Sequence, residues 1–523
     1  MAFSVSCNPA NRDPQSTTTN ETPISSNRPL GVLWPEWPSL ATDPVPEDFP
    51  VYFNDIPNRI HRFEYAVRGE IPTLASEIEK RMQQGKNYPF KKLVWLNIGN
   101  PQFCGQQPVS YFRDLVAGMM STRDVDHGEE INDTVERWQS ELTGGLGAYS
   151  HSKGALVFRK QAAQWFQKRD GFACDPESVY LTNGASGGAV AILDMMLNKG
   201  DGCLVPIPQY PLYSATIERI NGRFVGYELV EADEWRLDVD ALERCINTAR
   251  SDGIPVKVLV VINPGNPTGS VLTEKNLQDV IRLCEREKIV ILADEVYQDN
   301  IFNADVPFIP MRHLLLEMKS ECPLFSLHSG SKGFMGECGF RSGVLQTENV
   351  PEVFTRLLVK YFSVNLCSNV PGQCMMAAIL SHPRPDSAEY DQFIAEKTRI
   401  LGDLTRKAQL AHTRLNQMEG VVCQRINGAM YAFPKFEFTD RFIEEAKGNG
   451  RKPDVWYCYK LLNKCGIVTV PGSGFGQEEG TYHLRISLLP AVAEFEDAFD
   501  RWALFHSEVM NETPKTKECD KCV

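Results

Sequence analysis

The sequence has no stretch of apolar residues long enough to cross a membrane. A spanning helix needs about 20 such residues, whereas the longest apolar runs, such as Val256–Ile262 and Ile289–Ala293, have the length of single strands. The first 35 residues lack the apolar core of a secretory signal. A mitochondrial targeting segment would carry more Arg than they do. We therefore expect no membrane association and a cytoplasmic location, with the mitochondrion as the alternative.

Positive charge is also in short supply. Lys and Arg together number 54, whereas Asp and Glu number 67, which gives a formal net charge of −13 at pH 7. A protein this acidic has no general attraction for nucleic acid or for anionic lipid, and neither is expected as a partner. A small cationic pocket is still compatible with this composition, because salt screens surface charge beyond about 8 Å.

Paired cysteines are scarce, although the chain has 15 cysteines in all. The one Cys-x-x-Cys motif joins Cys519 and Cys522, and no second pair stands near it. A structural zinc site needs four ligands. We therefore predict no metal site and expect the thiols to be reduced.

The chain is long enough for more than one hydrophobic core. It has 523 residues, of which 42% are hydrophobic and 23% charged, as in soluble globular proteins. The following organisation is predicted: a disordered tail and arm at 1–50, a segment contributing to a small domain and to dimer contacts at 51–148, a large cofactor-binding domain at 149–380, a small C-terminal domain at 381–510, and a tail at 511–523.

Short apolar runs alternate with helical patterns in the predicted large domain. Strands are predicted at Val179–Leu181, Leu204–Ile207, Val258–Ile262, Ile289–Ala293 and Phe325–His328, and helices at Ala185–Leu197, Val239–Ala249 and Leu277–Glu287. Such an alternation is typical of parallel strands joined by crossover helices. The predicted fold class is therefore α/β, with a mostly parallel doubly wound sheet. A long helical pattern at Ile394–Met418, followed by short strands, indicates a smaller α+β domain.

Four polar stretches come at or just after the ends of predicted strands. They are TNGAS (182–186), NPGNPTG (263–269), ADEVY (293–297) and HSGSKG (328–333). Each is weak by itself, since an Asp after a strand usually caps a helix, and Asn-Pro and Pro-Gly are ordinary turn signals. Lys332 also lacks the glycine spacing and the following hydroxyl residue of a nucleotide-binding P-loop.

Together, these stretches suit pyridoxal 5′-phosphate. The aldehyde of that cofactor needs a lysine, and its ring nitrogen needs a buried carboxylate in order to stay protonated. Its phosphate needs free N–H groups at a helix start, together with hydroxyls and an arginine. Ligands of doubly wound sheets bind beyond the carboxyl ends of the strands. The sequence therefore predicts this cofactor at that edge.

Seven longer motifs resemble the fold-type I family of pyridoxal-phosphate-dependent aminotransferases, and within it the alanine aminotransferase group. The similarity runs from about residue 65 to about residue 506. The motifs are LNIGNPQ (96–102), GAYSHSKG (147–154), PIPQYPLYSA (206–215), VINPGNPTG (261–269), LADEVYQ (292–298), HSGSKGFMGECGFRSG (328–343) and VPGSGFGQEEGTYHLRISLLP (470–490).

The resemblance implies roles for the residues around the cofactor ring. Lys332 matches the lysine that forms the Schiff base and carries protons, and Asp294 matches the partner of the ring nitrogen. Tyr297 and Asn266 match the donors to the phenolic oxygen of the ring. Tyr210 matches the aromatic residue stacked on its face.

The resemblance also implies groups for the phosphate and for the substrate. The residues that match the phosphate cup are Ala185, Ser186, Ser329, Ser331 and Arg341. Tyr149 matches a tyrosine that reaches the phosphate from a neighbouring subunit, which implies a homodimer. Gly99 and Arg485, with Asn266, match the group that holds the substrate carboxylate.

The activity implied by the resemblance is transamination between L-alanine/pyruvate and glutamate/2-oxoglutarate by a ping-pong mechanism. Small-molecule amino and keto acids would be the partners. Two alternatives remain open. One is a glutamate:glyoxylate aminotransferase, and the other is a non-catalytic sensor that keeps the cofactor fold. Retention of Lys332, Asp294, Arg341 and Arg485 together argues against the sensor, which would not need a substrate clamp.

Overall fold

The computed structural model describes residues 69–123 and 125–511. The predicted N-terminal tail and arm, the tail at 511–523 apart from its first residue, and the Cys519–Cys522 pair lie outside the described residues.

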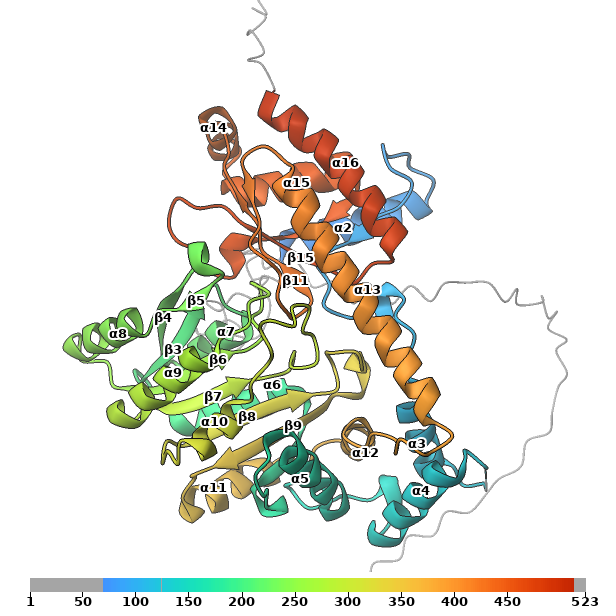
Figure 1. The fold of residues 1–523 in the computed structure, drawn as a ribbon. Coiled ribbons are helices and arrows are strands. Elements are labelled where there is room, and N and C mark those ends of the chain that lie inside the picture. Colours follow the sequence, from blue (N-terminus) through green and yellow to red (C-terminus); the bar gives the residue numbers. More distant parts are fainter. Residues whose placement is uncertain (1–68, 124, 512–523) are drawn as a thin grey trace, which may run out of the picture. The chain divides into compact units, whose positions relative to one another are not determined.

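Strands within residues 179–348 form a mixed eight-stranded sheet (Figure 1). Its strand order is β2-β9-β8-β7-β6-β3-β4-β5. The strands are β2 (Val179–Asn183), β3 (Gly202–Ile207), β4 (Arg223–Val230), β5 (Arg236–Leu237), β6 (Val256–Ile262), β7 (Val290–Asp294), β8 (Leu324–Ser329) and β9 (Ser342–Glu348).

The five strands from β8 to β4 run parallel to one another, whereas β2, β9 and β5 pair antiparallel with their neighbours. Asp294, the last residue of β7, lies opposite Ile262 of β6 and Leu327 of β8. The carboxyl ends of these parallel strands therefore meet at one edge, as the sequence predicts.

Helices cover both faces of the sheet, which confirms the predicted fold class. Alternate side chains of β6 explain why: Leu259 and Val261 pack toward α8, α9 and α10, while Val258 and Val260 pack toward α6, α7 and α11. These helices are α6 (Gly184–Met196), α7 (Leu212–Arg219), α8 (Val239–Ser251), α9 (Glu274–Glu287), α10 (Met311–Glu317) and α11 (Glu352–Ser363). Asp238 caps α8 and Thr273 caps α9 through their side-chain oxygens.

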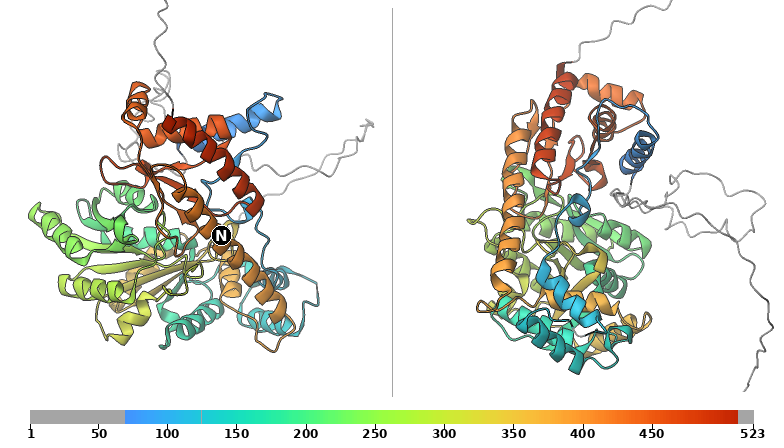
Figure 2. Two further views of the ribbon diagram at one scale, coloured as in Figure 1. Left: turned by 45° about the horizontal axis from the view of Figure 1, so that its top comes forward. Right: turned by 90° about the vertical axis from the view of Figure 1, so that its right-hand side faces the viewer.

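The remaining elements combine residues from both ends of the described chain (Figure 2). β1 (Val94–Trp95) pairs parallel with β13 (Ile467–Val468). β15 (Leu484–Ser487) lies between β11 (Tyr431–Ala432) and β14 (Val470–Pro471), and β10 (Val421–Val422) pairs with β12 (Lys435–Phe436).

The helices outside the sheet region are α2 (Glu70–Gln83), α3 (Ser110–Met120), α4 (Glu129–Glu141), α5 (Leu156–Asp170), α12 (Val370–Ile379), α13 (Tyr390–Asn416), α14 (Asp440–Gly448), α15 (Pro453–Cys465) and α16 (Val492–Asn511). α13 corresponds to the long helix predicted at Ile394–Met418. The predicted domain boundaries stay a prediction.

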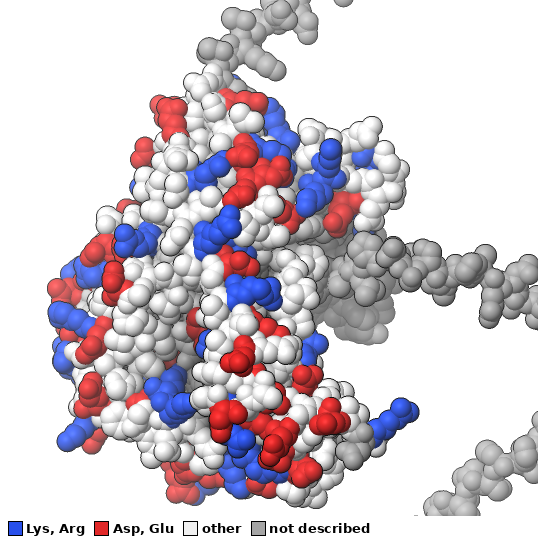
Figure 3. Space-filling model, turned by 45° about the vertical axis from the view of Figure 1, so that its right-hand side comes forward, with Lys and Arg blue, Asp and Glu red and all other residues white. Residues whose placement is uncertain are grey.

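Basic and acidic side chains are interspersed on the face shown in Figure 3. Within residues 69–123 and 125–511, no helix combines the length and the apolar character that a membrane crossing requires.

Candidate active site

Lys332 lies three residues beyond the end of β8, at the carboxyl edge of the sheet. Its Nζ atom donates a hydrogen bond of 2.5 Å to the carbonyl oxygen of Gly99. The side chain is half-buried. The structure therefore brings the predicted reactive amine next to a residue that the sequence places 233 positions away.

Asp294 ends β7 at the same edge and is 6% exposed. Its Oδ2 atom accepts a hydrogen bond of 2.7 Å from the Tyr213 hydroxyl. Its Oδ1 atom is buried and accepts no hydrogen bond from the described residues. Burial raises the pKa of Asp294 to about 6, although the Tyr213 hydroxyl and the Val296 N–H oppose this rise.

The next residue, Glu295, shows that a bare oxygen is not the rule for buried acids here. Glu295 accepts hydrogen bonds from Met311 N at 2.8 Å and Ser326 Oγ at 2.9 Å, and it pairs with Arg169 at 3.0 Å. Buried polar atoms without a partner are costly and uncommon. The bare Oδ1 of Asp294 therefore indicates a donor that belongs to a ligand.

The start of α6 forms a cradle of backbone and side-chain donors. Gly184 has φ +72°, and a Cβ there would lie 2.4 Å from Arg341 Nη2. Arg341 donates to Ser186 Oγ at 3.1 Å, and Ala185 lies between Gly184 and Ser186 in the first turn. Free N–H groups at a helix start attract anions, and a guanidinium binds phosphate oxygens in pairs.

Ser329 and Ser331 lie near this cradle. Ser329 ends β8, next to Gly343 of β9 in the sheet, and its Oγ atom accepts a bond of 3.4 Å from Ser331 N. An added Cβ at Gly343 would lie 2.6 Å from Ala185 N, so β9 and the start of α6 approach each other closely. The structure therefore gathers all five predicted phosphate residues.

Tyr297 and Asn266 lie together at the ring side of the site. Asn266 Nδ2 donates to the Tyr297 hydroxyl at 3.4 Å, and both residues are buried. Burial raises the pKa of Tyr297 well above its usual value, and the nearby Tyr431 and Tyr210 add to this effect. Tyr210 follows β3 at the same edge.

Arg485, in β15, is 1% exposed and has no carboxylate partner among the described residues. Its Nη2 atom donates to Asn97 O at 2.8 Å and its Nη1 atom to Asn266 Oδ1 at 3.3 Å. Its Nε atom is buried without a partner. A buried charge is normally paired, so this guanidinium is suited to an anionic ligand such as a carboxylate.

These observations fit pyridoxal phosphate. The bare oxygen of Asp294 suits a protonated ring nitrogen, the Gly184–Arg341 cradle suits a phosphate, and Lys332 Nζ lies at the same sheet edge. Tyr149 is not gathered with these residues: it is 79% exposed and precedes α5. Its predicted place across a subunit interface stays a prediction.

Several residues of the site are not among those predicted from the sequence. Tyr213 binds Asp294, Asn97 accepts from Arg485, and the rings of Tyr431 and Phe475 lie 4.4 and 4.7 Å from the Arg485 guanidinium carbon. Tyr213 stands in the PIPQYPLYSA motif, three residues after Tyr210, so helical spacing could have found it. No local signal distinguishes Tyr431 from a core tyrosine.

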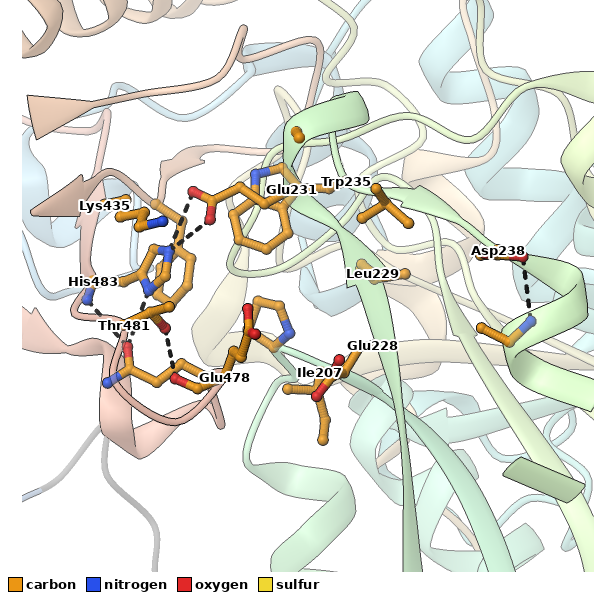
Figure 4. Close-up of a pocket in the computed structure, with 16 residues that line it drawn as sticks. Ile207, Glu228, Leu229, Glu231, Trp235, Asp238, Lys435, Glu478, Thr481 and His483 are labelled. Carbon is orange, nitrogen blue, oxygen red and sulfur yellow. Dashed lines mark hydrogen bonds and ion pairs between the residues drawn. The ribbon is translucent and has the colours of Figure 1, made fainter. Parts of the chain in front are cut away.

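A separate cavity of about 460 Å³ lies between β4, the start of α8 and residues 433–483 (Figure 4). None of the predicted site residues lines it. Its walls carry Glu228, Glu231, Asp238 and Glu478 against Lys435, and Glu231 bonds to His483 at 3.2 Å. This acidic lining repels phosphates and carboxylates, so the cavity does not compete with the Lys332 site.

The family model of class I and II aminotransferases matches residues 119–498, which includes every residue of the site except Gly99 and Asn97. The chain belongs to this aminotransferase family.

Curated relatives match the aminotransferase over most of its length. It is 41% identical to alanine aminotransferase 1, mitochondrial, of Arabidopsis thaliana over 476 residues, 88% of each chain. It is 41% identical to glutamate–glyoxylate aminotransferase 1 of the same plant over 472 residues, 88% of this chain and 96% of the relative. It is 40% identical to human alanine aminotransferase 1, with 86% and 93% covered.

Solved structures also resemble the aminotransferase. Alanine aminotransferase from Pyrococcus furiosus superposes with a TM-score of 0.70 at 25% identity, covering 87% of this chain and all of that one. An aminotransferase from Mycobacterium tuberculosis, at 20% identity and a TM-score of 0.67, shares the fold. The predicted family and enzyme class are thereby confirmed.

Proposed function

We propose that the chain transfers amino groups between L-alanine/pyruvate and glutamate/2-oxoglutarate with pyridoxal phosphate as cofactor. The observation that carries the proposal is a set of three complementary groups, two at the carboxyl edge of the eight-stranded sheet and one in β15 that bonds to Asn266 there. These are the Lys332 amine, the Asp294 carboxylate with one bare oxygen, and the buried Arg485 guanidinium without an anionic partner. The names of the alanine aminotransferase relatives support the choice of substrate.

Each residue has a distinct task in this proposal. Pyridoxal phosphate, when bound, supplies a carbonyl carbon that takes the amino group and a ring that accepts the electron pair freed at the substrate carbon. Asp294 Oδ1 holds the ring nitrogen in its protonated form. Ala185, Ser186, Ser329, Ser331 and Arg341 bind the phosphate, and Tyr297 and Asn266 donate toward the phenolic oxygen.

Lys332 Nζ moves the proton. Among the described residues, it is the one amine next to Gly99 at this edge. A free amine can accept a proton from the substrate carbon and return it to the carbon that takes the amino group. Arg485 and Gly99 orient the substrate so that its carbon faces this amine. The first keto acid leaves before the second enters, which gives ping-pong kinetics.

A panel of substrates tests the proposal. Purified holoenzyme is assayed with L-alanine and L-glutamate as donors against pyruvate, 2-oxoglutarate and glyoxylate. We expect the highest kcat/KM for alanine with 2-oxoglutarate. The equally similar glutamate–glyoxylate relative suggests glutamate with glyoxylate as the second candidate pair. A preference for that pair would overturn the assignment of alanine as substrate but not the transamination chemistry.

Lys332→Ala tests the chemistry itself. The variant should still bind pyridoxal phosphate through the cradle and Asp294, yet lose turnover by several orders of magnitude, because no other amine replaces it. Lys275→Ala, an exposed lysine of α9 that pairs with Asp279, serves as the control and should keep full activity. A Lys332→Ala enzyme that retained turnover would refute the assignment. The homodimer and the cytoplasmic or mitochondrial location remain part of the proposal.

A further inference from the structure

Tyr431 lies at the centre of the site, although no motif pointed to it. It belongs to β11 and is 2% exposed. A Cβ atom added to Gly99 would lie 2.0 Å from the Tyr431 hydroxyl oxygen and 3.2 Å from Lys332 Nζ. The hydroxyl and the amine therefore share the space above Gly99, which only a residue without a side chain leaves open.

The Tyr431 ring also fixes the Arg485 guanidinium. The guanidinium carbon lies 4.4 Å from the centroid of Tyr431 and 4.7 Å from that of Phe475. Contact of this kind is a cation–π interaction. Since Asn97 O and Asn266 Oδ1 take one bond each from Arg485, its remaining N–H groups are the ones available to a ligand.

A chain of hydrogen bonds leads to the Tyr431 hydroxyl and stops there. In the cofactor-free protein, Asn266 Nδ2 donates to Tyr297 at 3.4 Å, and the Tyr297 hydroxyl donates to Tyr431 at 3.4 Å. Neither bond uses the Tyr431 proton, and the Tyr431 hydroxyl has no other hydrogen bond in the described part of the chain. Arg485, whose guanidinium lies against the Tyr431 ring, cannot accept this proton, because a guanidinium only donates.

We propose that the Tyr431 hydroxyl donates a hydrogen bond to the substrate carboxylate bound by Arg485, so that a phenol and a guanidinium recognise it together. This inference rests on the proposed function, which places the substrate carboxylate at Arg485. The hydroxyl lies beside Lys332 Nζ at Gly99, and its ring lies against the Arg485 guanidinium. This position next to the proposed carboxylate site is the feature that supports the inference.

Electrostatics makes this recognition depend on pH. Burial raises the pKa of Tyr431, but the charges of Lys332 and Arg485, together with the hydrogen bond from Tyr297, hold the pKa below the usual tyrosine value. A carboxylate at Arg485 opposes those charges and so raises the pKa again. Carboxylate binding should therefore keep the proton on Tyr431 and weaken as the pH rises past the pKa of the free site.

Tyr431→Phe is the decisive variant, since it keeps the ring on Arg485 and removes only the hydroxyl. The probe is propionate, which has the carboxylate of alanine but no amino or keto group. Its dissociation constant is measured by calorimetry with the cofactor-loaded protein and again with the cofactor-free protein. We expect binding about 10- to 100-fold weaker than in the wild type, as for loss of a hydrogen bond to a charged group. KM for alanine should rise with little change in kcat.

Two further variants separate the possible outcomes. Tyr457→Phe, a buried tyrosine bonded to Trp502 and His506, controls for general loss of stability and should bind propionate normally. Arg485→Ala should lose propionate binding. If it does and Tyr431→Phe binds as tightly as the wild type, the Tyr431 inference is wrong while the proposed function stands. If Arg485→Ala also binds normally, the carboxylate site itself is wrong.

A measurement on the wild type covers the case in which Tyr431→Phe does not fold. Phenolate absorbance near 295 nm is followed in the cofactor-free protein at a pH at which part of Tyr431 is ionised. Propionate should abolish the phenolate signal of one tyrosine. An unchanged spectrum at saturating propionate would overturn the inference.

Discussion

Asp294 and Glu295 are neighbours in the chain and are both buried, yet their carboxylates have opposite surroundings. Glu295 is fully bonded to Arg169, Ser326 and the Met311 backbone, whereas Asp294 keeps one bare oxygen. A charged, buried oxygen without a hydrogen-bond partner destabilises the folded, cofactor-free protein. The cost at Asp294 should therefore disappear when a cation lies opposite it.

The raised pKa of Asp294 predicts how the stability of the cofactor-free protein depends on pH. Because the folded pKa, about 6, exceeds the ordinary aspartate value of 3.8, the stability from this group is fully present below pH 3.8 and is lost as the pH rises through 6. Between pH 5 and 7.5, wild type should lose about 1–2 kcal/mol relative to Asp294→Asn, given about 1.4 kcal/mol for each unit of pKa shift. Urea unfolding of both proteins measures this difference. Parallel pH profiles would contradict the prediction.

The same substitution should weaken cofactor binding. Asp294→Asn keeps the shape of the side chain but removes its charge, and a hydrogen bond to a charged group is worth roughly 1.5–3 kcal/mol. Pyridoxal phosphate should bind about 10- to 100-fold more weakly, as measured by equilibrium dialysis. Asp279→Asn, on the surface of α9, is the matched control and should leave the affinity unchanged.

Residues with distinctive chemistry could be predicted from the sequence, and buried aromatic residues could not. Lys332 and Asp294 stand in polar motifs after apolar strands, so their types and positions already suggest a site. Arg485 lies within β15, and only the resemblance assigns it to the site. Tyr431 stands in the apolar stretch GAMYAF, where a tyrosine is ordinarily part of the core. Its role depends on contacts with Gly99 and Arg485, which no local pattern encodes.

At the scale of elements, the start of α6 requires glycine at position 184. An L-residue in the left-handed region costs roughly 1–2 kcal/mol, and a Cβ there would displace Arg341 Nη2. Gly184→Ala should therefore lower both the melting temperature and the affinity for pyridoxal phosphate, the latter by about 10-fold or more if one charge-assisted bond is lost.

Gly187→Ala is the matched control on the same helix. Its added Cβ would lie no nearer than 3.7 Å to Asn183, and its φ is not positive. Since alanine favours helix over glycine by up to about 1 kcal/mol, this variant should be as stable as wild type or more so. Equal cofactor affinity in the two variants would show that the cradle does not hold the phosphate.

The sheet illustrates what local patterns leave open. The parallel strands β3, β6, β7 and β8 were predicted, because apolar runs between helices identify them. The antiparallel strand β9 was not predicted, although it separates β2 from β8 and brings Gly343 against the start of α6. Strand order is set by packing of the whole sheet. The short apolar run after Arg341 carries no information about where its strand lies in that order.

At the scale of the whole molecule, Tyr149 predicts a shared site between two copies of the chain. Its side chain is exposed. The resemblance implies that it binds the cofactor phosphate in the site of the neighbouring subunit. Tyr149→Phe should have low activity at limiting pyridoxal phosphate, and Lys332→Ala should have none. Mixing and refolding the two should restore activity, because the heterodimer contains one site with both native residues. A mixture no more active than Tyr149→Phe alone would refute the shared site.

The hydrogen bonds that join Leu96 to Ser487 and Asn97 to Arg485 can form only after the ribosome has synthesised residues near the C-terminal end of the described chain. Ribosomes release a chain from its N-terminus, and domains generally fold as they emerge. The groups at positions 184–341 that suit the cofactor leave the exit tunnel well before Arg485 does. We therefore expect a nascent polypeptide to complete the groups proposed for its vitamin-derived ligand before those proposed for the amino acid.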